Sequence, residues 1–307
     1  MPFKLNAYLP SKQTEVQIKE LSYKQYRELV KSLYNVSKKE TIQQYNSILE
    51  DLCPDIVGKN IAFEDKLSLL ITVRNYCVSP DLKLKGTLSS GETFNHALEV
   101  DTLQQLVNTI NKSKTISYNA FEVSFSSYKI KDEYVFSNNN YSTFVVLASY
   151  IDNIKVDNEA VDFKDLTLEE RVKIVEYLPQ ALVSLLQTEI TNIEAQYDVR
   201  DLLVVKNPLN GNIMLRLSCN ITYSVMQKLI ELLYSENLNN VYRAFYNIVN
   251  YAGFSAEYID SITPSEMQVY WMYFMQDREK SKEASGSREQ STPAGSLGAS
   301  PSSEFGF

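Results

Sequence analysis

The residue types that carry most enzyme chemistry are scarce in this sequence, which has a single histidine, His96, among 307 residues. His96 lies between Phe94 and Leu98 in a stretch of alternating apolar residues. A hydrogen-bonded structural histidine is far commoner in such a strand than a catalytic one. No nucleophile and acid stand beside it in the sequence. We therefore assign no catalytic residue and expect a protein that is not an enzyme.

The three cysteines, Cys53, Cys77 and Cys219, are the next candidates for reactive or metal-binding chemistry. Their odd number and wide spacing, without a C-x-x-C pair, support neither a disulfide framework nor a zinc site. We expect buried thiols in a reducing compartment. The phosphate-binding patterns G-x-x-x-x-G-K-[ST] and G-x-G-x-x-G do not occur either. The sequence therefore predicts no metal site and no cofactor.

Several acidic residues that could form a catalytic carboxylate pair are better explained by helix ends. Glu40, Glu170 and Glu266 each follow a Ser or Thr by three residues. This is the spacing of a capping box, in which the two side chains bond each other's backbone N–H groups. Asp51, Glu64 and Asp65 fall at predicted helix ends. We interpret this set as capping or solvated.

The composition favours a folded protein that works through contacts with other proteins. Hydrophobic residues make up 44% of the chain, including 21 Tyr and 13 Phe. The net charge is −8 and the Lys and Arg residues are scattered, which argues against a nucleic-acid partner. No apolar run approaches the ~18 residues of a membrane span, and no secretory signal pattern opens the chain. We expect no membrane and no small-molecule substrate, and a cytoplasmic location.

The apolar periodicity predicts a mainly helical α+β fold in four segments. Residues 1–80 form an N-terminal region of a strand and helices, and residues 81–162 form a small β-containing region. Residues 163–283 form a helical region with one hairpin. Residues 284–307 are rich in Ser, Gly, Pro and Ala and have few large apolar side chains, so we expect a flexible tail there.

Within the N-terminal region, short-range alternation over residues 15–20 predicts a strand. Helical spacing then predicts a first helix over 21–33. A second helix begins after Ser37 and ends before Pro54, and a third contains residues 67–74.

The β-containing region begins with a hairpin over residues 82–100, followed by a helix over 103–110. Residues 116–125 and 144–154 are expected to be further strands, with a polar loop between them. A sheet built from these strands would be small, because each run of alternation is short.

The helical region opens with a long segment over residues 167–193, broken before Pro179. A second hairpin over 203–217 precedes a helix that reaches Leu233. The final helix, over 263–282, has a cap, a proline and a glutamate that agree on its first residue.

Aromatic residues supply the candidate partner-binding positions. One cluster surrounds the final helix, where it can serve core packing, a partner interface or both, if the partner completes the burial. A second pair stands on the predicted tail and could dock as apolar anchors. The six candidates are Tyr270, Trp271, Tyr273, Phe274, Phe305 and Phe307.

Three segments carry a resemblance to a known family. They are LPSKQTEVQIKELSYKQYRELVKSLY at 9–34, DKLSLLITVRNYCVS at 65–79 and SITPSEMQVYWMYFMQDREKSK at 261–282. In layout and boundary residues they resemble the baseplate hub subunits and hub assembly proteins of T-even-like contractile-tailed bacteriophages. Members of that family can carry a C-x-x-C hairpin where this chain has SSGETF at 89–94. No zinc-binding role is therefore carried over.

The resemblance implies a nonenzymatic protein that forms part of a phage tail baseplate hub or helps to assemble it. Its partners would be other hub proteins, met in the host cell cytoplasm during assembly. A virion component and an assembly chaperone both need exposed complementary surface, so the sequence is compatible with both. A different interpretation is a phage adaptor that recruits a clamp or polymerase component through Phe305 and Phe307.

Overall fold

The protein is seen in a computed structural model that is mainly helical with small sheets, the predicted α+β class. It forms two compact units. The N-terminal unit comprises Met1–Glu20 and Lys31–Ser235, and the C-terminal unit comprises Leu21–Val30 and Glu236–Phe307. The predicted four-segment division stays a prediction. The structure describes residues 4–35, 37–57, 61–87, 91–109, 113–137, 142–157, 159–196, 204–206, 214–216, 230, 233–234 and 236–289.

The chain begins with an antiparallel hairpin of strands β1 (Lys4–Leu9) and β2 (Thr14–Lys19). The sequence prediction contained only the second strand. Helices α1 (Tyr23–Ser32), α2 (Lys38–Leu52) and α3 (Phe63–Cys77) follow, with a short 3-10 turn η1 (Pro54–Ile56) after α2. The three predicted helices are confirmed. Ser37 caps α2, because its side chain accepts the N–H of Glu40.

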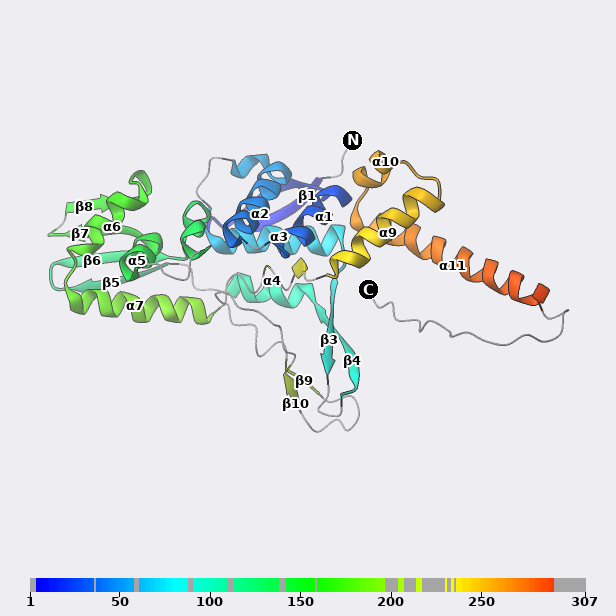
Figure 1. Ribbon diagram of the computed structural model, residues 1–307. Helices are drawn as coiled ribbons and strands as arrows, with labels where there is room; N and C mark the ends of the chain where they lie inside the picture. The colour runs from blue at the N-terminus through cyan, green and yellow to red at the C-terminus, as the bar shows by residue number, and fades with distance from the viewer. Residues whose placement is uncertain are drawn as a thin grey trace. The chain divides into compact units, whose positions relative to one another are not determined.

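Helix α3 is the centre of the N-terminal unit and lies between α2 and α4 (Val100–Thr109) in Figure 1. Its buried residues include polar ones on every side. Asp65 accepts the N–H groups of Ser11 (2.8 Å) and Ala62 (3.2 Å), so it caps the helix as predicted. Glu64 is only 1% exposed, and its interpretation as a solvated residue was wrong. Burial raises its pKa, because an apolar environment disfavours the ionised carboxyl.

One ion pair of α3 is fully enclosed. Lys66 Nζ lies 2.6 Å from Glu133 Oε2, and the two side chains are 1% and 0% exposed. Glu133 lies in the 3-10 helix η2 (Ile130–Ser137), and Asn46 of α2 donates to the same carboxylate oxygen at 3.3 Å. Burial lowers the pKa of Lys66, and the adjacent Glu133 carboxylate opposes that shift. Helices α2, α3 and η2 are thus joined at the buried Glu133 carboxylate.

The predicted hairpin and helix after α3 are confirmed as β3 (Asp81–Thr87), β4 (Thr93–Glu99) and α4. A four-stranded antiparallel sheet then runs in the order β5-β6-β7-β8. Its strands are β5 (Ser113–Tyr118), β6 (Phe121–Ser126), β7 (Ile151–Val156) and β8 (Glu159–Asp162).

The predicted strand over 144–154 was wrong in its first half. Residues Thr143–Tyr150 form helix α5, and strand β7 begins only at Ile151. The side chain of Ser142 accepts the N–H of Val145 and starts the helix. A short apolar run with β-branched residues fits a strand by pattern alone, so here the cap and the packing of α5 against its neighbours decide the outcome.

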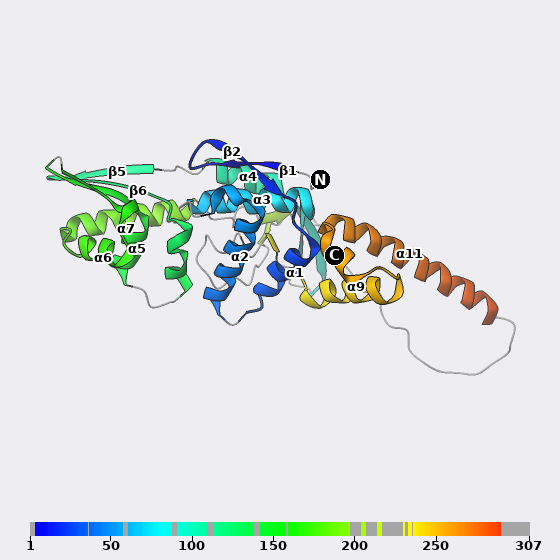
Figure 2. The same cartoon turned by 90° about the horizontal axis from the view of Figure 1, so that it is seen from above.

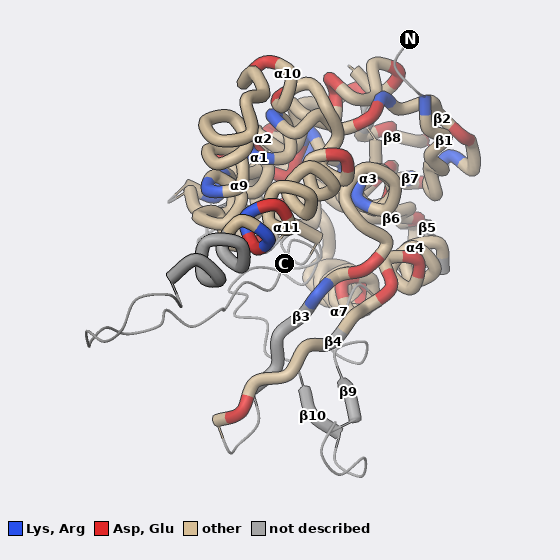
Figure 3. The backbone as a smooth tube through the Cα atoms, turned by 90° about the vertical axis from the view of Figure 1, so that its right-hand side faces the viewer, with Lys and Arg blue, Asp and Glu red and all other residues tan. Residues whose placement is uncertain are grey.

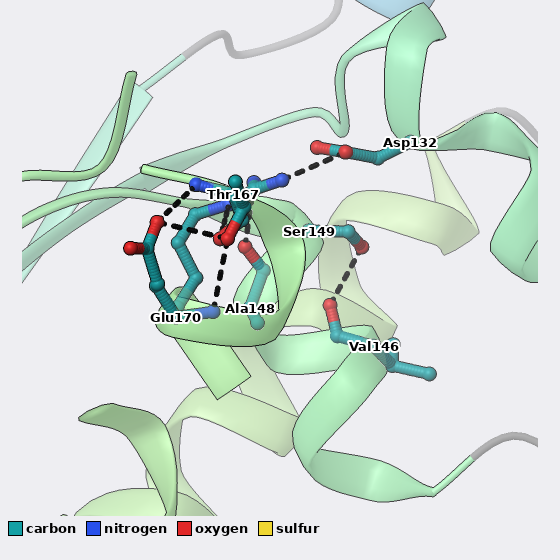
Figure 4. Close-up of polar contacts among 7 residues, drawn as sticks. Asp132, Val146, Ala148, Ser149, Thr167 and Glu170 are labelled. Carbon is teal, nitrogen blue, oxygen red and sulfur yellow. Dashed lines mark hydrogen bonds and ion pairs between the residues drawn. The ribbon is translucent and has the colours of Figure 1, made fainter. Parts of the chain in front are cut away.

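Helices α6 (Leu168–Glu176) and α7 (Gln180–Ala195) confirm the long helical segment broken at Pro179. Figure 2 shows α5, α6 and α7 gathered on one side of the four-stranded sheet. Thr167 and Glu170 form the predicted capping box: Glu170 Oε2 accepts the Thr167 N–H at 2.8 Å, and Thr167 Oγ1 accepts the Glu170 N–H at 3.3 Å (Figure 4). The hydrogen bonds that the Glu170 carboxylate accepts from the N–H and the hydroxyl of Thr167 lower the pKa of Glu170.

A second buried ion pair ties α6 to η2 and α5. Arg171 Nη2 donates to Asp132 Oδ1 at 2.7 Å, and both side chains are 4% exposed. Its Nη1 donates to the Ala148 carbonyl at 3.0 Å. A planar, forked guanidinium can serve two acceptors at once, which a lysine cannot do with the same geometry.

The second predicted hairpin is confirmed in its described part by strands β9 (Val204–Lys206) and β10 (Met214–Arg216).

The C-terminal unit is built from the first part of α1 with α9 (Leu238–Tyr251), α10 (Ala256–Ser261) and α11 (Pro264–Glu289). Helices α9 and α10 were not predicted. Helix α11 starts where predicted but continues past Lys282 to Glu289. Residues 284–289, which were predicted to belong to the tail, are therefore helical.

Candidate protein-interaction surface

Helix α11 carries four of the predicted partner-binding residues, and a complete capping box sets its position. Glu266 Oε2 accepts the Thr263 N–H at 2.8 Å, and Thr263 Oγ1 accepts the Glu266 N–H at 3.3 Å. Pro264 occupies the first helical position, where its missing N–H costs no hydrogen bond. This local chemistry fixes the residue at which the helix starts.

The structure places the four predicted residues on two different faces of α11. Tyr270 packs on Phe254, with ring centroids 4.8 Å apart, and its hydroxyl lies 2.9 Å from that of Tyr258. Trp271 and Phe274 are half-buried and stack on each other at 5.6 Å. Tyr273 is 62% exposed. Three of the residues therefore pack within the C-terminal unit, and only Tyr273 is presented outward.

Tyr273 belongs to an exposed apolar stripe that the sequence analysis did not single out. Val269 is 41% exposed and Met272 is 55% exposed. These two residues and Tyr273 have the spacing i, i+3 and i+4, which places them on one side of a helix. The stripe faces away from Met267, which is buried on the packed side.

Helix α9 presents a second set of exposed aromatic residues. Tyr242 and Tyr246, one helical turn apart, are 36% and 56% exposed. Tyr251 is 61% exposed, and its ring lies 6.1 Å from that of Tyr246. Arg278 of α11 lies 5.6 Å from the Tyr251 ring and 5.4 Å from the Phe274 ring. Cation–π contacts thus connect the exposed residues of α9 to the packed face of α11.

The first part of α1 holds α9 and α10 in place. The Tyr23 hydroxyl donates to the Val241 carbonyl at 3.0 Å, and burial raises the pKa of Tyr23. Arg27 lies 3.8 Å from the Phe245 ring centroid and forms an ion pair with Asp260 of α10. Because these contacts are half-buried or buried, the exposed tyrosines stand on a fixed scaffold.

We call the exposed apolar residues of this unit the C-terminal aromatic surface. Seven of the fifteen large, exposed apolar side chains among the described residues belong to it, so such side chains are more frequent here than in the described part of the N-terminal unit. Its members are Tyr242, Tyr246, Tyr251, Tyr258, Val269, Met272 and Tyr273.

A composition signal in the sequence could have located this surface. Ten of the residues in 238–276 are aromatic and four are charged, whereas the whole chain is 11% aromatic and 22% charged. Figure 3 shows α9 almost entirely in the colour of uncharged residues. Enrichment in aromatic residues together with depletion of charge is the compositional mark of a protein interface.

The structure says less about the other residues that the sequence analysis considered. The side chain of His96 and the residues Phe305 and Phe307 lie outside what the structure describes. Cys53 and Cys77 are buried thiols. In the described part of the chain no three His, Cys, Asp or Glu side chains are grouped so that they could hold a metal ion. None of the helices among the described residues is long and apolar enough to cross a membrane.

Comparison with known proteins connects this architecture to a phage structure. Residues 2–201 match the model of a family described as T4 bacteriophage base plate protein. The chain belongs to this family. It is therefore a protein of the bacteriophage tail base plate, an assembly in which it meets other base plate proteins. No curated protein and no solved structure matches the chain.

The family match covers α1 to α7 and ends before the C-terminal aromatic surface. The buried ion pairs of Lys66 and Arg171 lie inside the match, whereas Tyr242 to Tyr273 lie beyond it. The matched region also contributes the first part of α1 to the C-terminal unit.

Proposed function

We propose that this protein is a structural or assembly component of the hub of a contractile phage tail base plate, and that it acts by contacts with other hub proteins. The observation that carries the proposal is the C-terminal aromatic surface, which joins large apolar side chains to a low charge density. Family membership supplies the setting, and this surface supplies the means of contact.

The chemistry of the surface suits binding to a protein. Tyr and Trp are enriched among the residues that dominate interface energies, because they offer large contact area with few rotatable bonds. Tyr246 and Tyr273 are more than half exposed, yet their helices are held by buried contacts. A partner that covers these rings gains apolar burial with little cost in ordering the protein.

We also propose that the protein catalyses no reaction. Its assembly contacts would form in the host cytoplasm and, if it is a virion component, persist in the tail. Mass spectrometry of purified particles separates the two roles: a virion component is present in fixed ratio to other base plate proteins, and a chaperone is absent.

The test of the contact surface is co-purification from infected cells with the tagged full chain. The double variant Tyr242→Ala/Tyr246→Ala removes two exposed rings, and we expect it to reduce recovery of base plate proteins by about tenfold or more. Tyr177→Ala is the matched control, since Tyr177 is 88% exposed but lies in the N-terminal unit. Equal recovery of base plate proteins with the double variant, the control and the unchanged chain would contradict the proposal.

A further inference from the structure

The exposed stripe of α11 raises the question of what covers it. Val269, Met272 and Tyr273 are about half exposed on average. Taking roughly 200 Å² for each large side chain, the stripe exposes on the order of 300 Å². A stable interface needs about 800 Å² per partner. The stripe alone is too small for a folded subunit and fits a short peptide with one or two aromatic residues.

The chain itself contains such a peptide. Residues 303–307 read Ser-Glu-Phe-Gly-Phe, with Phe305 and Phe307 as the only aromatic residues after Phe274. We propose that this peptide docks on the α11 stripe of the same molecule, with the two rings over Met272 and Tyr273. The proposal rests on the proposed function in one respect: the docked peptide would cover part of the C-terminal aromatic surface until a partner displaces it.

The length of the connecting segment fits this contact. Helix α11 ends at Glu289, about 24 Å along the axis from Tyr273 at 1.5 Å per residue. Residues 290–304 are rich in Ser, Gly and Pro. Fifteen residues of such a linker have a root-mean-square span of about 21 Å and a maximum of about 50 Å. Effective concentration is highest when the typical span of a linker matches the distance to be bridged.

Charge and register agree with the same placement. Lys280 is exposed, and it follows Tyr273 by two helical turns, so it continues the face of the stripe. Glu304 directly precedes Phe305. Lys280 and Tyr273 are separated by about 10 Å along the helix, close to the span of three extended residues. An antiparallel peptide can thus pair Glu304 with Lys280 while its two rings reach the stripe.

The test measures oxidation of Met272 by hydrogen peroxide in the full chain, followed by mass spectrometry of its peptides. A tethered peptide at an effective concentration of about 1 mM half-occupies a site of millimolar affinity. We therefore expect Phe305→Ala/Phe307→Ala to double the Met272 oxidation rate. Ser302→Ala/Ser303→Ala is the matched control and should leave the rate unchanged. Met267, which is 2% exposed, reports whether the fold is intact.

Three outcomes decide the proposal. A doubled rate that does not depend on protein concentration supports docking within one molecule. Equal rates of Met272 oxidation in all three chains overturn it. Protection of Met272 that grows with protein concentration also overturns it, because the peptide that covers the stripe then comes from a second copy. The measurement needs no base plate protein, so its failure leaves the tyrosine test of the proposed function intact, and the reverse also holds.

Discussion

Substituting Lys66 by methionine should destabilise the N-terminal unit more than any change at an exposed ion pair. The substitution keeps an unbranched side chain that is one atom shorter, and it removes the charge. Glu133 is then left as a carboxylate that is 0% exposed, with only the Asn46 amide, 3.3 Å away, donating to the oxygen that Lys66 contacted. Its other oxygen accepts no hydrogen bond from the described residues.

The size of the effect follows from this isolation. Removing one partner of a buried ion pair costs about 3–5 kcal/mol, because the remaining charge has lost its water and its counter-ion. For a unit of this size each kcal/mol lowers the melting temperature by about 2–4 °C. Lys66→Met should therefore lower it by about 6–20 °C. Thermal unfolding followed by circular dichroism measures this shift.

Two further variants make the reasoning testable. Lys66→Met/Glu133→Leu removes both charges, and we expect it to recover at least about 2 kcal/mol of the loss, because a buried pair is often no better than apolar residues of similar volume. Lys155→Met breaks the exposed pair with Glu122, whose side chains are 45% and 43% exposed, and should cost about 0–1 kcal/mol. A single Lys66 variant as stable as the Lys155 variant would refute the argument.

Three other predictions concern single residues of the same unit. Because the pKa of Glu64 is raised in the folded state, the stability of the protein falls as the pH rises from 4.5 through that raised value. Glu64→Gln should therefore be more stable than the unchanged chain at pH 7. Thermal melts at several pH values should show that this difference vanishes below pH 4.5. Arg171→Lys should lose one of the two buried hydrogen bonds that the guanidinium donates to Ala148 and Asp132. We expect the free energy of unfolding, measured in urea, to fall by about 1.5–3 kcal/mol. Thr167→Ala removes the α6 cap and should cost about 1 kcal/mol, with faster amide exchange in the first turn of α6.

The features that could be predicted from the sequence are those set by neighbours in the chain. The capping boxes at Thr167 and Thr263 need only two residues three apart, and both are present in the structure. Pro179 separates two helices for the equally local reason that proline lacks an N–H and excludes the helical conformation before it. The hairpin over 82–100 combines alternation with a turn, and it forms as predicted.

What the sequence did not reveal depends on contacts between distant segments. Glu64 and Lys66 look like ordinary first-turn residues, and they are buried only because η2 and Ser127, more than 60 residues later, close over them. Helix α5 has the composition of a strand, so its state is decided by Ser142 and by packing on α6 and α7. Tertiary contacts override local preference in both cases.

The candidate site also combines features set by neighbouring residues with features set by distant contacts, and this determines how it should be tested. The sequence located α11 but could not say that Tyr270 packs inward while Tyr273 points outward, because that depends on α9, α10 and the first part of α1. Deleting residues 236–307 would remove the Val241 acceptor of Tyr23 and the Asp260 partner of Arg27. A truncated chain that failed to bind would therefore report damage to α1. Substitution of an exposed ring such as Tyr246 leaves those contacts in place, so lost binding then reports the surface itself.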